Sequence, residues 1–268
     1  MPVRETTWAG RRIWEKQYPE RVALPRRIGL HALERISAWT GLGPLRPPPH
    51  HAGAQALATE SRRLQELHGQ GIRVPELIDE THDALRLGDI GPTLAARLRA
   101  ADGDPEKTDA LTLAAIRAIL DGHRRGAYFG QALPRNLTLD EQGVGFLDFE
   151  EDPLEVMTLE QAQARDWMLF TFGMAKFYDR RPRALERLLS QAFRDESAAV
   201  NREAHRVGER LRRLAPVLGR FGRGGRTIAQ AVVVLAQASA AWLPVLLLGM
   251  VLLDLALDGE LDMLMFLQ

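Results

Sequence analysis

The alternation of apolar and polar residues predicts a chain that is mostly helical after a strand-containing beginning. Helical periodicity, with apolar residues three and four positions apart, runs over residues 54–69, 111–125 and 159–178. A shorter helical pattern covers residues 28–39. Residues 12–18 instead alternate apolar and polar side chains, which is typical of a strand. These patterns together favour an α+β fold.

Turn signals separate these elements. Four prolines between residues 41 and 53 exclude a regular helix, because each removes a hydrogen-bond donor and fixes φ. His50 and His51 in this segment are expected to form a surface pair rather than a metal site, since no further ligands stand at helical spacing. Residues 84–98 predict a strand, a Gly/Pro break and a helix, and residues 101–105 a turn.

A small hairpin is predicted between Leu137 and Leu147. Two short apolar segments flank a turn at 141–143 that contains a glycine. Folding the hairpin would bring Asn136, just before its first strand, near Asp148, just after its second. An amide oxygen and a carboxylate placed in this way are suitable ligands for Mg²⁺, a hard cation that shares its coordination sphere with water and phosphates.

Composition narrows the function classes. The chain has 268 residues, and Lys+Arg and Asp+Glu are balanced at 35 each, so no global charge favours nucleic acid as the main partner. The absence of cysteine excludes disulfides, thiolate zinc sites and cysteine nucleophiles. No signal-peptide pattern is present at the start of the sequence, which leads us to expect a cytoplasmic location for the catalytic-looking part.

The last third of the chain differs in character. Residues 199–226 are rich in arginine, and residues 227–253 contain no charge. Such an apolar stretch is long enough to cross a bilayer, and the flanking charges would put the preceding part on the cytoplasmic side of the inner membrane. Pro244 also allows a pair of buried helices instead. The arginine-rich segment could be a solvated surface helix, or it could contact anionic lipid headgroups.

The loop and hairpin resemble the catalytic and metal-binding loops of the protein-kinase-like superfamily, most closely its branch of Kdo/heptose lipopolysaccharide kinases. That family has His-Gly-Asp, then Asn, then a hairpin ending in Asp-Phe-Gly. Asn136 matches the metal-binding Asn, and Asp148 begins the matching triplet, with Glu150 in place of Gly. Gln131 stands where the family has its catalytic Asp. The resemblance covers roughly residues 10–180 and is strongest over 120–170.

The resemblance implies roles for residues farther away. Lys16, on the predicted strand, matches the lysine that contacts nucleotide phosphates, although no glycine-rich loop precedes it, and the alternative is a solvated lysine on an edge strand. Glu60 matches the carboxylate that orients the lysine. Asp166 matches an Asp that binds the backbone of the catalytic loop, the alternative being a surface acid. His123 is expected to be a structural residue. Segment 84–94 resembles the hinge that meets adenine, or is an ordinary strand, turn and helix.

The implied architecture has two lobes. A small strand-containing N-lobe would cover residues 1–90 and a helical C-lobe with the catalytic and metal loops residues 91–200. Residues 201–268 would hold the arginine-rich segment and an apolar C-terminal helix or helix pair.

The implied function is a phosphotransferase that uses ATP and Mg²⁺. Its acceptor would be a hydroxyl of an envelope glycolipid or sugar, or of a protein. Because Gln131 cannot act as a base, Glu150 or Asp152 could take that role. Alternatively, the chain is a membrane-tethered pseudokinase that binds nucleotide or a partner without catalysis. Neither a Gly-x-Gly-x-x-Gly nor a Gly-x-Ser-x-Gly motif supports a Rossmann-type or hydrolase interpretation.

Overall fold

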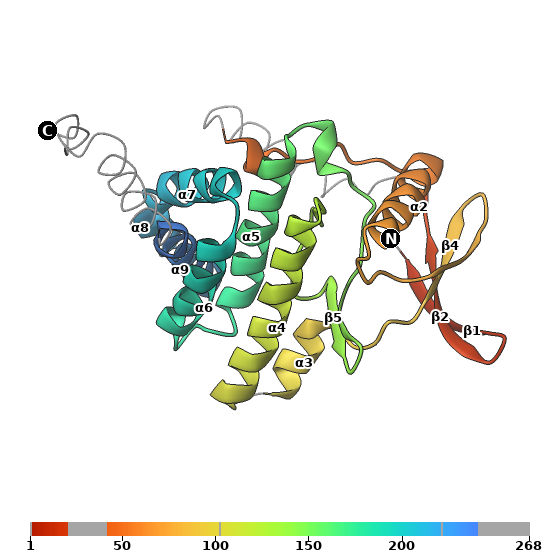
Figure 1. The fold of residues 1–268 in the computed structure, drawn as a ribbon, viewed down its shortest axis with the longest axis horizontal. Coiled ribbons are helices and arrows are strands. Elements are labelled where there is room, and N and C mark those ends of the chain that lie inside the picture. Colours follow the sequence, from red (N-terminus) through yellow and green to blue (C-terminus); the bar gives the residue numbers. More distant parts are fainter. Residues whose placement is uncertain (1, 21–41, 102, 221, 241–268) are drawn as a thin grey trace, which may run out of the picture.

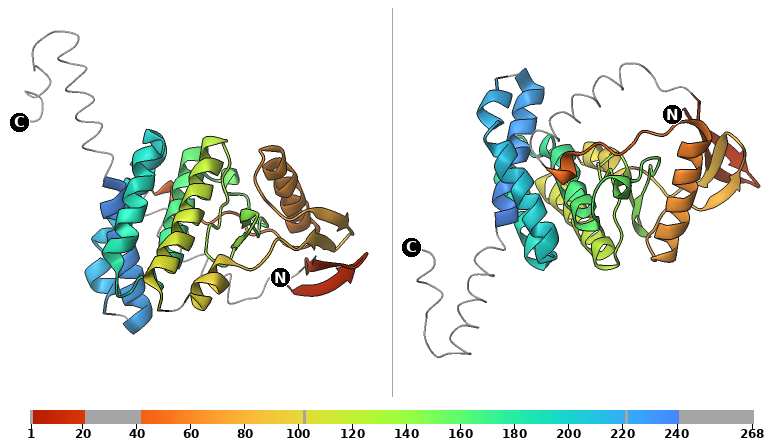
Figure 2. Two further views of the ribbon diagram at one scale, coloured as in Figure 1. Left: turned by 60° about the horizontal axis from the view of Figure 1, so that its bottom comes forward. Right: turned by 90° about the horizontal axis from the view of Figure 1, so that it is seen from above.

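A small antiparallel sheet and a larger helical part make up this α+β chain, for which a computed structural model describes residues 2–20, 42–101, 103–220 and 222–240 (Figure 1). The helix expected over residues 28–39 lies outside the described residues. Figure 2 shows the sheet at one end of the molecule and the last helices of the bundle at the other.

The sheet has the strand order β1-β2-β4-β3, and all its neighbouring strands are antiparallel. Its strands are β1 (Val3–Trp8), β2 (Arg11–Gln17), β3 (Leu77–Glu80) and β4 (Ala84–Gly88). The predicted strand at 12–18 is therefore confirmed as β2. A turn of Ala9 and Gly10, both with positive φ, joins β1 to β2, as a tight hairpin requires.

Helix α2 (Gly53–Gly69) confirms the helix predicted over residues 54–69 and lies against β4. Its buried side contains Leu57, Leu64 and Leu67, and between them the carboxylate of Glu60. Because these residues are three or four positions apart, they occupy one face of the helix. Glu60 is thereby carried into the interior, facing the sheet.

Two helices and a hairpin follow the sheet. They are α3 (Leu94–Ala100), α4 (Pro105–Arg124), β5 (Leu137–Asp140) and β6 (Gly143–Phe146). Helix α4 begins before residue 111, where periodicity placed it, because the Asp104 side chain caps the backbone N–H of Lys107 and Pro105 occupies the first turn. The hairpin is confirmed, with Leu137 opposite Phe146.

The remaining helices form a bundle next to α4. They are α5 (Leu159–Ala175), α6 (Pro182–Asp195), α7 (Ala198–Arg212), the short α8 (Ala215–Leu218) and α9 (Gly222–Ser239), with 3₁₀ turns η1 (Gly43–Leu45) and η2 (Pro153–Glu155) elsewhere. A continuous hydrophobic core runs through the described part of the chain, from Leu85 and Leu64 near the sheet, through Ile119 and Trp167, to Leu235 in α9.

Only the first part of the apolar stretch 227–253 lies within the described residues. Residues 227–239 belong to α9, which packs against α5, α6 and α7, and α9 approaches α7 closely because Gly208 lies against Ala236. This part matches the expectation of a buried helix. Residues 241–253, the other part of the expected membrane span, lie outside the described residues. Among the residues that are described, no helix combines the length and apolar character needed to cross a membrane.

Candidate functional site

A cleft of about 740 Å³ opens where the sheet meets the hairpin. The sheet contributes Trp14, Lys16 and Leu87, and the segment after β4 contributes residues 88–91. Gln131, Arg135, Asn136, Thr138, Leu147, Asp148 and Glu150 line it from the loops and strands around the hairpin. Trp14 and Lys16 share a face of β2 because side chains alternate along a strand.

Lys16 is the centre of a buried ionic cluster in this cleft. Its Nζ lies 2.6 Å from Glu60 Oε2, 2.7 Å from Asp148 Oδ1 and 3.6 Å from Glu150 Oε2. The Tyr18 hydroxyl also donates to Glu60 Oε2, at 2.7 Å. The contact expected between Lys16 and Glu60 is therefore present, whereas Glu66 pairs with arginines on its own helix.

The cluster shifts the pKa of both partners of the Lys16–Glu60 pair. Burial by itself would lower the pKa of Lys16, but the carboxylates of Glu60, Asp148 and Glu150 outweigh it and raise that pKa. Burial raises the pKa of Glu60, and Lys16 opposes this effect. Lys16 thus stays charged, and Glu60 depends on it for compensation of its own charge.

The hairpin brings Asn136 and Asp148 together as expected. Asn136 Nδ2 lies 3.5 Å from Asp148 Oδ2 and donates to the Gln131 carbonyl at 3.1 Å, while the Leu147 N–H donates to the Asn136 carbonyl at 2.8 Å. Asp148 has a φ of 71°, in the left-handed region that costs a non-glycine residue about 1 kcal/mol or more. The surrounding contacts maintain this unfavourable backbone conformation, and in it the Asp148 carboxylate lines the cleft and contacts Lys16.

The donor set at this point fits a hard divalent cation. Carboxylate oxygens of Glu60, Asp148 and Glu150 lie within 4.8 Å of one another. Because Asn136 Nδ2 is engaged by the Gln131 carbonyl, its Oδ1 is the atom that can serve as a ligand. All these ligands are oxygens, as Mg²⁺ prefers. The ammonium of Lys16 lies among these three carboxylates and compensates part of their negative charge.

Gln131 contacts a carboxylate that the sequence analysis missed. Its Nε2 donates to Glu151 Oε2 at 3.2 Å, and His50 Nδ1 lies 3.1 Å from Glu151 Oε1. The expectation of a surface pair at His50 and His51 is corrected, because their side chains are only 8% and 13% exposed and each contacts a glutamate. The contact between residues 50 and 151 is distant in sequence, so no local pattern could indicate it.

Asp166 supports the loop that carries Gln131. It is completely buried in α5 and accepts a hydrogen bond from the Phe129 backbone N–H at 2.7 Å, which excludes the surface alternative. His123 packs between the Phe129 and Trp167 rings, and its Nδ1 lies 2.7 Å from Glu196 Oε2. The structural role expected for His123 agrees with this burial.

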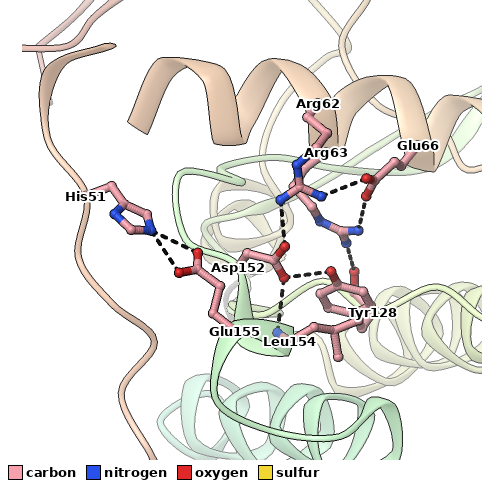
Figure 3. A network of polar contacts seen from close by, with 8 residues as sticks. All are labelled: His51, Arg62, Arg63, Glu66, Tyr128, Asp152, Leu154 and Glu155. Atoms are coloured by element: carbon pink, nitrogen blue, oxygen red, sulfur yellow. Dashed lines mark hydrogen bonds and ion pairs between the residues drawn. The ribbon is translucent and has the colours of Figure 1, made fainter. Parts of the chain in front are cut away.

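A second polar network ties α2 to the same loops (Figure 3). Arg62 Nη2 lies 2.6 Å from Asp152 Oδ2, and the Tyr128 hydroxyl donates to Asp152 Oδ1 at 2.7 Å. Arg63 stacks on the Tyr128 ring at 3.7 Å and donates to the Tyr128 carbonyl at 2.7 Å. Helix α2, which carries Glu60, is therefore bound to the loop at Tyr128 and to the loop at Asp152.

This network corrects the expectation for Asp152. Burial would raise the pKa of Asp152, but hydrogen bonds from Tyr128 and Arg62 outweigh it and lower that pKa. Its oxygens are engaged by these two side chains and by the Leu154 N–H, and it does not line the cleft. Of the two acids considered as substitutes for a catalytic Asp, only Glu150 lies in the cleft.

Comparison with models of protein families gives no match for this sequence, and comparison with curated proteins gives none either.

Proposed function

We propose that the cleft binds ATP with Mg²⁺ and that the protein is a kinase-like phosphotransferase acting on a hydroxyl group. The observation that carries the proposal is the position of Lys16, held between Glu60 and Asp148 at 2.6 and 2.7 Å on the wall of a cleft of about 740 Å³. A buried lysine beside an oxygen-ligand cluster suits a polyphosphate and its cation.

Each charged residue has a role in this proposal. Lys16 would donate to phosphate oxygens, and Glu60, fixed by α2, would hold its ammonium in place. Asp148 and Asn136, with Glu150 beside them, would hold Mg²⁺, which neutralises phosphate charge when bound. Phosphoryl transfer depends mainly on such positioning and charge compensation, so a preformed cluster of this kind is a fitting scaffold.

The apolar part of the cleft offers a place for the adenine ring of the nucleotide. Leu64, Leu87, Ile90 and Leu147 line it together with Trp14, whose Nε1 donates to Asp89 Oδ1 at 3.0 Å. Apolar side chains of this kind suit the faces of a planar ring, and residues 88–91 line the same cleft. That adenine binds at segment 84–94, which resembles the hinge of the kinase family, therefore stays a prediction.

In the proposed step, the acceptor hydroxyl oxygen forms a bond to the γ-phosphorus as the bond to the bridging oxygen breaks, and ADP leaves. Gln131 would orient the hydroxyl by hydrogen bonding. Glu150, the acid among residues 150–152 that lines the cleft, would take up the proton released by the hydroxyl. The acceptor class remains the one the resemblance implies, an envelope glycolipid or sugar hydroxyl or a protein side chain.

The first test is a thermal-shift titration with ATP and Mg²⁺, comparing wild type with Asp148→Asn. We expect saturable stabilisation that needs Mg²⁺ and disappears in the variant. Asp179→Asn, an exposed carboxylate outside the cleft, is the control with the same change of charge and should respond like wild type. The proposal fails if wild type shows no shift at millimolar ATP.

A second candidate function is nucleotide binding without catalysis. Gln131 favours it, because an amide cannot accept a proton near neutral pH. Transfer of labelled γ-phosphate to water or to added acceptors separates the two functions. An active wild type would support the phosphotransferase, whereas binding without transfer, with activity gained in Gln131→Asp, would support the second function.

A further inference from the structure

One end of the helical bundle carries a concentrated positive charge. From Arg210 to Leu253 the sequence has six arginines and no acidic residue, although the whole chain is neutral. The end of α7, the short α8 and the start of α9 bring the described arginines of this segment together at the end of the long axis opposite the sheet (Figure 1). We call this surface the basic corner, formed by Arg212, Arg213, Leu214, Val217, Arg220, Arg223, Arg226 and Ile228.

Four of the five arginines of the basic corner form no ion pair with a carboxylate among the described residues. Arg212 forms an ion pair with Glu209 at 2.9 Å. No carboxylate of the described chain lies within ion-pair distance of the other four, which are all exposed: Arg213, Arg220, Arg223 and Arg226. Such a group of unpaired guanidinium ions attracts a surface with many negative charges.

Apolar side chains are interspersed with these arginines. Leu214, Val217 and Ile228 are 41%, 51% and 46% exposed, while the described residues include only three further exposed large hydrophobic side chains. Aliphatic groups between cations match the boundary of a bilayer, where hydrocarbon lies just below charged headgroups. A nucleic acid would supply phosphates but no hydrocarbon layer for these three side chains.

We infer that the basic corner docks the protein on the surface of an anionic phospholipid bilayer. The arginines would contact headgroup phosphates, and Leu214, Val217 and Ile228 would enter the interface. Since the basic corner lies at the end of the bundle opposite the sheet (Figure 1), and the sheet and the hairpin line the cleft, docking would leave the cleft accessible from solvent. The inference goes beyond the proposed function and does not depend on it.

The test uses the full chain and sedimentation with lipid vesicles. Wild type should bind vesicles that contain one-third phosphatidylglycerol and should bind pure phosphatidylcholine vesicles far more weakly. Raising the ionic strength from about 0.1 M to about 1 M, which shortens the Debye length from about 10 Å to about 3 Å, should release most of the protein.

Charge reversal identifies the surface responsible. Each arginine near an anionic bilayer contributes about fivefold to partitioning, so reversing four should lower binding at least several hundredfold. This variant is R213E/R220E/R223E/R226E. The control carries the same charge change on exposed arginines elsewhere and should keep more of the binding: R99E/R117E/R183E/R187E.

Three results would overturn the inference. The first is equal binding by the corner variant and wild type, which would assign membrane contact to another part of the chain. The second is equal loss in both quadruple variants, which would reduce the effect to net charge. The third is binding of an RNA oligonucleotide but not of anionic vesicles. The thermal shift with ATP and Mg²⁺ should be unchanged in the corner variant, which keeps this test separate from that of the proposed function.

Discussion

Replacing Lys16 with Met tests the energetics of the buried ionic cluster directly. The substitution keeps an unbranched side chain of similar length but removes the charge that lies 2.6 Å from Glu60 and 2.7 Å from Asp148. Glu60 is 1% exposed and, among the described residues, would keep the Tyr18 hydroxyl as its side-chain donor. A buried carboxylate would thus be left without its cation.

The expected magnitude follows from the burial of each partner. Removing one member of a buried ion pair costs about 3–5 kcal/mol, a large share of the free energy of unfolding of about 5–15 kcal/mol that is usual for native proteins. Asp148, with a side chain 31% exposed, is partly solvated and adds little to this loss. We therefore expect Lys16→Met to lower the free energy of unfolding by about 3–5 kcal/mol near neutral pH.

The loss should grow with pH. Burial already raises the pKa of Glu60, and removal of Lys16 raises it further. Between the ordinary pKa of a glutamate and this raised value, the folded state binds more protons than the unfolded state, so stability falls as pH rises. The difference between variant and wild type should accordingly be smaller at about pH 5 than at about pH 8.

Guanidinium denaturation followed by tryptophan fluorescence measures these differences. The double variant Lys16→Met/Glu60→Gln should recover much of the loss, because it also removes the uncompensated charge. Lys107→Met, at an exposed lysine, is the control and should change stability by less than about 0.5 kcal/mol. A loss below about 1 kcal/mol at pH 8, or no recovery in the double variant, would refute the reasoning.

Two further predictions concern contacts around the cleft, and a third concerns the packing of α7 against α9. The carboxylates of Asp166 and Glu196 outweigh burial and raise the pKa of His123. The wild-type protein should therefore lose stability as pH rises above the ordinary histidine pKa. In denaturation curves, Glu196→Gln should lower the free energy of unfolding more at about pH 6 than at about pH 9. Arg62→Ala removes an ion pair whose arginine is half exposed, while the buried Asp152 keeps its hydrogen bonds from Tyr128 and Leu154, so the change should cost about 1 kcal/mol. It should also weaken ATP binding in thermal-shift titrations because α2 carries Glu60; unchanged affinity would contradict this. Gly208→Ala would place a Cβ 2.7 Å from the Ala236 Cα and should cost about 1–3 kcal/mol, whereas Gly224→Ala in open space should be neutral or stabilising.

The sequence by itself determined the local elements of this protein. The helix at residues 54–69, the strand at 12–18 and the hairpin between Leu137 and Leu147 appear as predicted, because side-chain periodicity and turn residues act over a few positions. The hairpin also places Asn136 beside Asp148, a consequence of geometry that the turn alone imposes.

The tertiary structure decided which side chains meet across long separations. Strand β1 was not predicted, since it is mostly exposed and gains its order from pairing with β2. The Glu150-Glu151-Asp152 run shows the same limit. Three adjacent acids have similar local signals, but one lies beside Lys16, one reaches Gln131 and His50, and one is held by Arg62.

The physical reason is the same in each case. Periodicity tells which face of an element is buried, but an ion pair or hydrogen bond depends on which of many possible partners the packing brings within about 3 Å. Residues 227–239 illustrate this for apolar groups. Their composition fits a lipid or a protein interior equally well, and only the packing of α9 against α5, α6 and α7 places them in the core.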